Sequence, residues 1–163
     1  KVWTTPSDEN PIFRDGKEAV TELMDVFVTG TELVRDVRLG GFLGEEAGQD
    51  KPRQALFWRS GQTVPSLAVN MAGMRALLDA SKLAGTLPAE QAFLGSSALF
   101  EFSNAANALS TLNGPIADVL TDPNKRAKLA YFGVVTSSLS DIFGTQMSGA
   151  LGLTSGFSSL DGD

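Results

Sequence analysis

Apolar side chains recur at steps of three and four residues in four separate stretches of this 163-residue chain. This spacing constrains the fold more than any other feature, because it places the apolar side chains on one face of an α-helix. The alternation that a half-buried strand requires is missing, and Gly and Pro residues separate the four stretches. The pattern predicts an all-α protein, a four-helix bundle of the up-down type.

The first two helices are bounded by turn-forming residues. The first is expected over residues 15–38, with its apolar face at Val20, Met24, Phe27, Thr31 and Val34, and it ends at Gly40-Gly41. The second begins either at Ser60, as its N-cap, or just before Pro65, and it ends by Gly85. Its inward residues are expected to be Val64, Leu67, Met71, Met74 and Leu78.

The third and fourth helices follow the same pattern. The third is expected over residues 88–113, with Leu94, Ala98, Phe102, Ala105, Leu109 and Leu112 inward. Phe93 and Phe100 broaden its apolar face, which is typical of a helix that touches two neighbours. After one extra turn at 116–120, Asp122 and Pro123 are a strong N-cap and first-position signal. This fourth helix is expected to reach Ala150, with Leu129, Phe132, Val135, Leu139, Phe143 and Met147 inward.

The remaining segments read as connections within one domain, residues 1–163. Residues 40–58 predict a long first connection, a feature that is usually functional or crosses the end of a bundle. Phe57 and Trp58 are expected to attach its far end to the core. Residues 151–163 are rich in Gly and Ser and predict an irregular C-terminal tail.

Composition excludes several classes of function for these residues. The chain has no Cys and no His, so it offers no disulfide, thiolate nucleophile or imidazole metal ligand, and no Ser-His-Asp triad. The net charge is −6, and residues 1–50 hold eleven acids and five bases. This acidic balance argues against a nucleic acid partner, which requires a basic surface. The sequence contains no run of about 20 apolar residues, so no transmembrane segment is predicted.

Carboxylate pairs do not add up to a metal site. Glu18 and Glu22 share one face of the first helix, but a di-metal bundle also needs inward Glu and His ligands from other helices, which this chain does not offer. Asp161-Gly162-Asp163 can be read as a calcium-type acidic turn or as the end of a tail, and it is too short for an EF-hand loop. We therefore predict no metal ligand here.

Arginine and amide side chains near the start of the second helix are the better candidates for binding. Arg59 beside Ser60 is either an anion or carboxylate anchor at a helix N-terminus or an ion-pair partner next to an ordinary cap. Asn70 lies in an otherwise apolar helix, so it either bonds to a neighbouring helix or lines a cavity.

Four segments resemble the imelysin family. The first two are Asn10-Pro11-Ile12-Phe13 and the helix ending Arg38-Leu39-Gly40. The third runs from Lys51 through Arg59-Ser60-Gly61 to Leu67 and is followed by Asn70, Gly73 and Arg75. The fourth is the ending Leu151–Asp163. The resemblance covers the chain from about Asn10 to its C-terminus and matches the family's second half. The Arg-Ser-Gly run and the Phe-x-x-x-Asp-Gly-Asp tail are the most specific pieces.

The resemblance implies a bacterial protein exported to the periplasm or outer membrane, often regulated by iron and classed with the M75 peptidases. Such proteins contain two helical bundles, so residues 1–163 would be the second. The family's Gly-x-His-x-x-Glu signature lies in the first bundle and its site between the bundles. We therefore expect no catalytic residue here, and either a wall of a ligand site linked to iron acquisition or the non-catalytic half of a metallopeptidase.

The resemblance also suggests site residues and partners. The polar lining of the ligand site would comprise Arg38, Arg59, Ser60, Asn70 and Asp161. Expected partners are the N-terminal bundle and an iron or iron-chelate ligand, with iron or zinc as the metal of the intact protein and no cofactor in these residues. A lone bundle would expose an apolar patch, through which a homo-oligomer can form.

Overall fold

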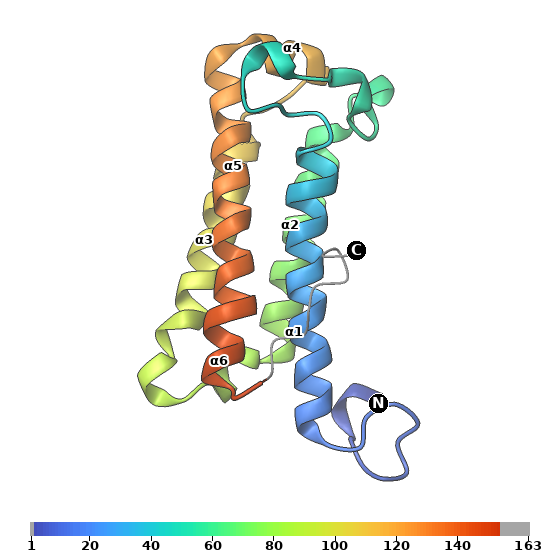
Figure 1. Ribbon diagram of the computed structural model, residues 1–163, viewed down its shortest axis with the longest axis vertical. Helices are drawn as coiled ribbons and strands as arrows, with labels where there is room; N and C mark the ends of the chain where they lie inside the picture. The colour runs from blue at the N-terminus through green and yellow to red at the C-terminus, as the bar shows by residue number, and fades with distance from the viewer. Residues whose placement is uncertain (1, 154–163) are drawn as a thin grey trace.

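The structure, a computed structural model, describes residues 2–153 (Figure 1). Four long helices alternate in direction: α1 (Gly16–Glu32), α2 (Thr63–Ser81), α3 (Phe93–Ser110) and α5 (Pro123–Asp141). Two short helices complete it, α4 (Ile116–Thr121) before α5 and α6 (Ser148–Ala150) at the end. The prediction of an all-α helical bundle is confirmed, and no strand occurs within the described residues.

Two of the long helices continue beyond their regular part as wider π-helical turns. The first extension is Leu33–Leu39 after α1, and the second is Ile142–Met147 after α5. Together with α6 these extensions bring the first and fourth helices to the ends expected from the sequence, near residue 38 and at Ala150. In the first extension the Gly40 amide donates to the Arg35 carbonyl at 2.9 Å, five residues back.

Caps explain where α1 and α5 begin. Asp15 accepts a hydrogen bond from the Glu18 amide at 2.9 Å, and Glu18 in turn accepts one from the Arg14 amide at 2.8 Å. Asp122 accepts from the amides of residues 124 and 125, and Pro123 occupies the first position of α5, as expected.

The structure decides between the two starts that the sequence left open for α2. The helix begins at Thr63, just before Pro65 as the second alternative had it, and Ser60 is not its N-cap but lies in the 3-10 turn Trp58–Ser60. The start of α3 differs from the expectation. Residues 88–92 are not part of α3, because Pro88 has an extended ψ of 148° and the turn Ala89–Gln91 is a 3-10 turn.

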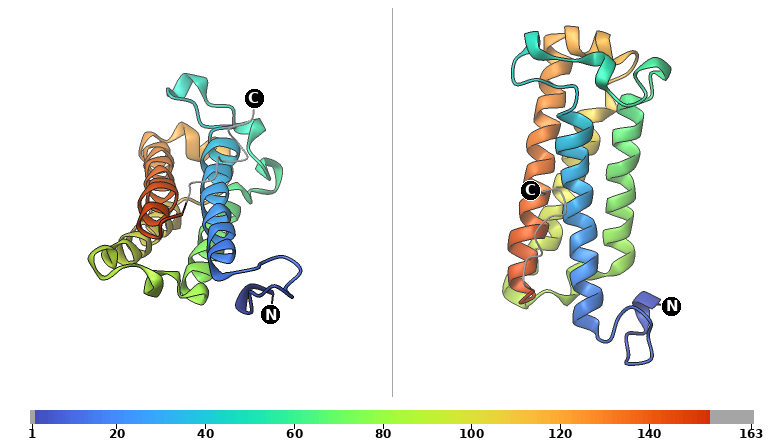
Figure 2. Two further views of the ribbon diagram at one scale, coloured as in Figure 1. Left: turned by 60° about the horizontal axis from the view of Figure 1, so that its bottom comes forward. Right: turned by 45° about the vertical axis from the view of Figure 1, so that its right-hand side comes forward.

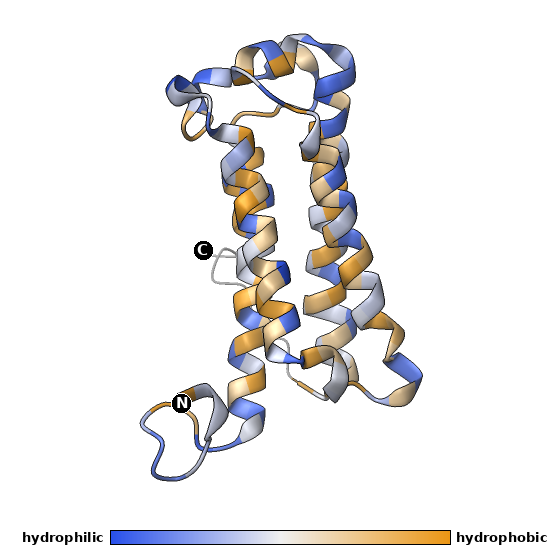
Figure 3. Ribbon diagram, turned by 180° about the vertical axis from the view of Figure 1, so that it is seen from behind, coloured by the Kyte–Doolittle hydropathy of each residue, from blue (hydrophilic) through white to orange (hydrophobic). Residues whose placement is uncertain are grey.

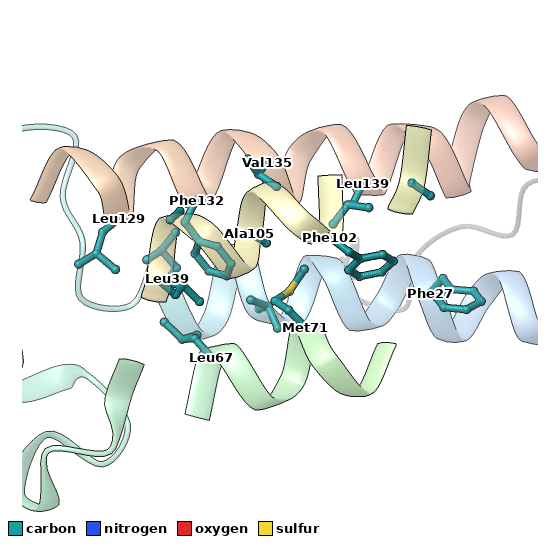
Figure 4. Packing of buried hydrophobic residues seen from close by; sticks show 14 of the residues in the cluster. Phe27, Leu39, Leu67, Met71, Phe102, Ala105, Leu129, Phe132, Val135 and Leu139 are labelled. Carbon is teal, nitrogen blue, oxygen red and sulfur yellow. The ribbon is translucent and has the colours of Figure 1, made fainter. Parts of the chain in front are cut away.

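The inward faces predicted from periodicity form the core. Figure 4 shows Phe27, Leu67, Met71, Phe102 and Phe132 meeting between the helices. The Phe27 and Phe143 rings stack with centroids 4.4 Å apart. Every inward residue expected for the third and fourth helices is buried, which confirms the 3.6-residue periodicity as the folding signal.

Three aromatic residues expected in the core lie on the surface instead. Phe93 and Phe100 are 61% and 65% exposed, although they were expected to broaden the buried face of α3. Phe57 is 50% exposed, whereas Trp58 packs against the core as expected. The reason for Phe93 and Phe100 is that α3 is apolar on both faces, so apolarity alone does not mark its inward side (Figure 3).

The helices stand in the order α1, α2, α3, α5 around the core, and the long connection crosses one end of the bundle (Figures 1 and 2). α1 approaches α2 closely at Gly30, where an added Cβ would lie 2.8 Å from the Met74 sulfur. This contact places the last turn of α1 beside the middle of α2, so that the π-helical extension of α1 runs on along the first turns of α2. Within residues 2–153 no helix is long and apolar enough to cross a membrane.

Candidate functional site

Arg38 lies where the π-helical end of α1 meets the start of α2. Its Nη1 donates to the Asn70 Oδ1, and its Nη2 donates to the Ser66 Oγ at 2.7 Å. Ser66 and Asn70 are four residues apart, so they share one face of α2 and together hold the guanidinium. The structure thus brings together Arg38 and Asn70, two of the five residues that the resemblance suggested as a polar lining, and adds Ser66, which the sequence analysis missed.

The Arg38 guanidinium keeps a buried donor, its Nε, without a partner. Its Nε is buried and bonds to no atom of residues 2–153, and no carboxylate of those residues lies within ion-pair distance. A buried donor without an acceptor destabilises the state that contains it, by about 1–3 kcal/mol. A half-buried cation with only neutral partners is therefore a site where an external acceptor is favoured.

An open groove of about 610 Å³ lies beside this guanidinium. Its polar lining is Arg38, Gln62, Ser66 and Asn70, and its apolar lining is Leu56, Phe57, Pro65 and Val69. We call it the Arg38 groove. Leu56, Phe57 and Val69 are 51%, 50% and 71% exposed, so the groove offers apolar surface that nothing in the described chain covers.

The backbone of Phe57 is held in an unusual conformation at the edge of the Arg38 groove. Its φ of 65° lies in the left-handed region, which a bulky residue adopts at a cost. Neighbouring bonds fix it there: the Phe57 carbonyl accepts from the amides of Ser60 and Gln62 at 3.2 and 3.3 Å. The Leu56 carbonyl accepts from the Thr63 hydroxyl at 2.7 Å. The turn therefore presents an aromatic ring to solvent at the groove, a feature without an obvious sequence signal.

Arg59 and Ser60 lie next to the groove but do not line it. The Arg59 guanidinium stacks over the Trp58 ring, 5.1 Å from the centroid, and its side chain is exposed. The Ser60 hydroxyl donates to the Phe57 carbonyl at 3.1 Å. Asp161, the fifth residue suggested by the sequence, lies outside the described residues.

A second arginine site, between the long connection and α5, was not anticipated from the sequence. Arg126 donates from Nε to the Asp50 Oδ2 at 2.7 Å, and from Nη2 to the Asp50 Oδ1 at 3.1 Å and to the Gly44 carbonyl at 2.7 Å. Asp50 also accepts a hydrogen bond from the Gly44 amide at 2.9 Å. The Arg126 side chain is 15% exposed and the Asp50 side chain 6%. This buried pair ties the connection to the start of α5.

Burial and pairing act in opposite directions on the Asp50 carboxyl. Burial raises its pKa, but the hydrogen bonds from Arg126 and Gly44 and the charge of Arg126 outweigh it, so the pKa of Asp50 is lowered. The hydrogen bonds to Asp50 raise the pKa of Arg126, and this effect exceeds the opposing effect of its burial. Both groups therefore stay charged at neutral pH. Each is the counter-charge of the other within the fold, so we assign this cluster a structural role.

Within the part of the chain that the structure describes, the residues do not fit a metal centre. The sequence has no His or Cys, and within residues 2–153 no three acidic side chains gather closely enough to hold an ion. We therefore derive no step through zinc or iron from these residues. The chemistry that the Arg38 groove can supply is recognition of a ligand that has an anionic or acceptor group and an apolar body.

Comparison with known proteins gives one match. Residues 1–141 match the family model of imelysin, Peptidase_M75. No curated protein and no solved structure matches the chain significantly. Because the family model covers most of the chain, the protein belongs to the imelysin family.

Proposed function

We propose that this bundle forms one wall of a ligand site in an exported bacterial protein that takes part in iron acquisition. The observation that carries the proposal is the Arg38 guanidinium, held by two neutral side chains with its buried Nε unsatisfied. Such a group binds an oxyanion strongly, since a charged hydrogen bond in a partly buried place is stronger than one in water.

The ligand class follows from the two halves of the Arg38 groove. The guanidinium favours carboxylate or another planar oxyanion, and the exposed apolar side chains favour a ligand with an apolar or compact body. An iron chelate with carboxylate groups combines both properties, and in this proposal its iron is cargo rather than a resident cofactor. The N-terminal bundle of the intact protein would supply the opposite wall, and Arg59, Ser60 and Asp161 would extend the polar lining.

Family membership supports the cellular setting of the proposal. Imelysin-family proteins are bacterial and typically exported. We place this protein in the periplasm or at the outer membrane, as a lipoprotein. The alternative role, the non-catalytic half of an M75-type metallopeptidase, requires metal ligands from another part of the protein, because this sequence has no His and no three acidic side chains gather within residues 2–153.

Calorimetric titration with ferric citrate tests the proposal. Replacement of the charge in Arg38→Gln should weaken binding by at least about tenfold, since one charged hydrogen bond contributes roughly 1.5–3 kcal/mol. Arg53→Gln is the matched control, because Arg53 is exposed in the 3-10 turn Pro52–Gln54 and lines no part of the Arg38 groove. Far-UV circular dichroism checks that both variants fold.

Four outcomes separate the two proposed roles. Loss of affinity in the Arg38 variant alone supports the proposal. Equal affinity in all three proteins removes Arg38 from the site, and no binding by the wild type removes the iron-chelate ligand. Chelator-sensitive proteolysis that is unchanged in the Arg38 variant favours the metallopeptidase alternative.

A further inference from the structure

Helix α2 is packed on one side only. It contacts α3 along its length and the π-helical end of α1, and its remaining side faces away from the bundle (Figure 2). Its 19 residues include only two charged side chains, Arg75 and Asp79. A surface helix of a monomer usually carries a charged outer face, so a helix this apolar on its open side is typical of a contact surface.

The exposed residues of α2 show the character of this side. They are Pro65, Val69, Asn70, Ala72, Gly73, Arg75, Ala76, Asp79 and Ala80. Val69 is 71% exposed. Apart from the charged pair, only Asn70 is polar, and it turns toward α1 to bond Arg38. We call the part centred on Ala76, with Arg75, Asp79, Ala72 and Ala80, the α2 face.

An open apolar groove of about 440 Å³ borders the α2 face. It runs between α2 and α3 over the side chains of Met71, Phe102 and Leu109, with Ala72 and Arg75 on its α2 wall. All five residues of the α2 face are exposed, so no other described element of the chain covers it. Since Arg75 lies roughly half a turn around the helix from Ser66 and Asn70, this surface is distinct from the Arg38 groove.

The two charged residues of the α2 face, Arg75 and Asp79, are placed so that they would pair across a two-fold axis. Arg75 and Asp79 are four residues apart, so they lie on the same face, yet no ion pair joins them to each other or to any residue in the range 2–153. Arg75 makes one long hydrogen bond, 3.4 Å, to the Ser103 hydroxyl. A second α2, running antiparallel about a two-fold axis near residue 77, would place Arg75 opposite Asp79 and Asp79 opposite Arg75.

We propose that the α2 face binds a second copy of this chain in a symmetric dimer. A two-fold contact requires a self-complementary surface, and a single Arg-Asp pair on an uncharged helix meets that requirement. Small side chains at Ala72, Ala76 and Ala80 let the two helices approach closely, and the charges fix their antiparallel register. The inference does not depend on the proposed iron-linked function, because it involves other residues.

Charge reversal combined with mixing tests the pairing directly. In Arg75→Asp both facing positions become acidic, and in Asp79→Arg both become basic, so each variant should repel itself. Sedimentation analysis over about 5–500 µM should show a dimer for the wild type and a dissociation constant at least tenfold weaker for each variant. An equimolar mixture of the two variants should dimerise again, because each acidic position then faces a basic one.

Matched controls remove the effect of net charge. Arg53→Asp and Glu90→Arg make the same charge changes at exposed positions outside α2, and they should dimerise as the wild type does. Raising the salt concentration should weaken the wild-type dimer, since exposed ion pairs are screened.

A monomeric wild type over the whole range would overturn the proposal, as would single reversals without effect. A mixture that stays monomeric would also overturn it, because repulsion at some other contact would then explain the single variants. Rescue by mixing is the supporting result, and it identifies the partner as a second copy rather than another bundle.

Discussion

The buried ion pair between Asp50 and Arg126 makes the most quantitative prediction about stability. Asp50→Asn keeps the size of the side chain and an oxygen that can accept from the Gly44 amide, but it removes the charge and the acceptor of the Arg126 Nε. Arg126, whose side chain is 15% exposed, then keeps only neutral acceptors, the Gly44 carbonyl and the retained oxygen of residue 50. Breaking a buried pair on one side costs about 3–5 kcal/mol when the remaining charge is fully enclosed.

The expected loss is smaller than that limit because Arg126 keeps the Gly44 carbonyl and a little contact with water. We expect Asp50→Asn to lower the free energy of unfolding by about 2–3 kcal/mol, which for a chain of this size lowers Tm by roughly 5–10 °C. Urea unfolding followed by far-UV circular dichroism measures the change, with the m-value checking that unfolding stays two-state.

A double-mutant cycle isolates the pair itself. Arg126→Gln, Asp50→Asn and the double variant should give a coupling energy of about 2 kcal/mol, because the two side chains share two hydrogen bonds. Arg14→Gln, which breaks the exposed pair with Glu18, is the control and should change stability within experimental error. A coupling energy near zero would show that the pair does not tie the long connection to α5.

Three further predictions concern pH, backbone strain and capping. Because the pKa of Asp50 is lowered in the folded state, its stabilisation is present above its unfolded-state pKa and is lost as the pH falls through the lower folded value. The stability difference between the wild type and Asp50→Asn should therefore stay constant from neutral pH to about pH 5 and shrink below about pH 4, as urea titrations at each pH will show. Phe57→Gly should raise the free energy of unfolding by about 1 kcal/mol, because Gly adopts a positive φ without strain; a loss of stability would mean that the Phe57 ring packs usefully. Asp122→Ala should lower it by about 1 kcal/mol through loss of the N-cap of α5, whereas Asp118→Ala, on α4, should have little effect.

The helices and their inward faces could be predicted because the information is local. Residues such as Phe27, Phe102 and Phe132 recur at helical spacing, and the caps at Asp15 and Asp122 lie within four residues of the amides that they accept from. The same reasoning misplaced Phe93 and Phe100, because a helix with apolar residues on two faces has no unique inward side. It left two starts open for α2, and only the one just before Pro65 is right, because Ser60 has the chemistry of an N-cap but is held in a separate turn.

The contacts between distant residues could not be predicted from one sequence. Arg126 and Asp50 are 76 residues apart, and their pairing depends on the path of a connection that has no regular pattern. The resemblance suggests Arg38 and Asn70 as lining residues, but their contact depends on how far α1 extends, and its π-helical end sets that length. A signal for Ser66 was present, since it lies one turn before Asn70 on the same face.

The contrast between Arg38 and Arg126 is the strongest structural reason to place recognition at the first and architecture at the second. Both are arginines in partly buried places near the same end of the bundle. Arg126 faces a carboxylate of its own chain, so its charge is neutralised as the protein folds. Arg38 has only an amide and a hydroxyl as partners within the described chain, and these orient a guanidinium without neutralising it. A folded protein gains nothing in stability from a half-buried cation without a counter-charge, because its desolvation is not offset. An anionic group from outside these residues offsets that desolvation cost when it binds. The uncompensated charge of Arg38, which destabilises the free bundle, then contributes to the affinity for the ligand.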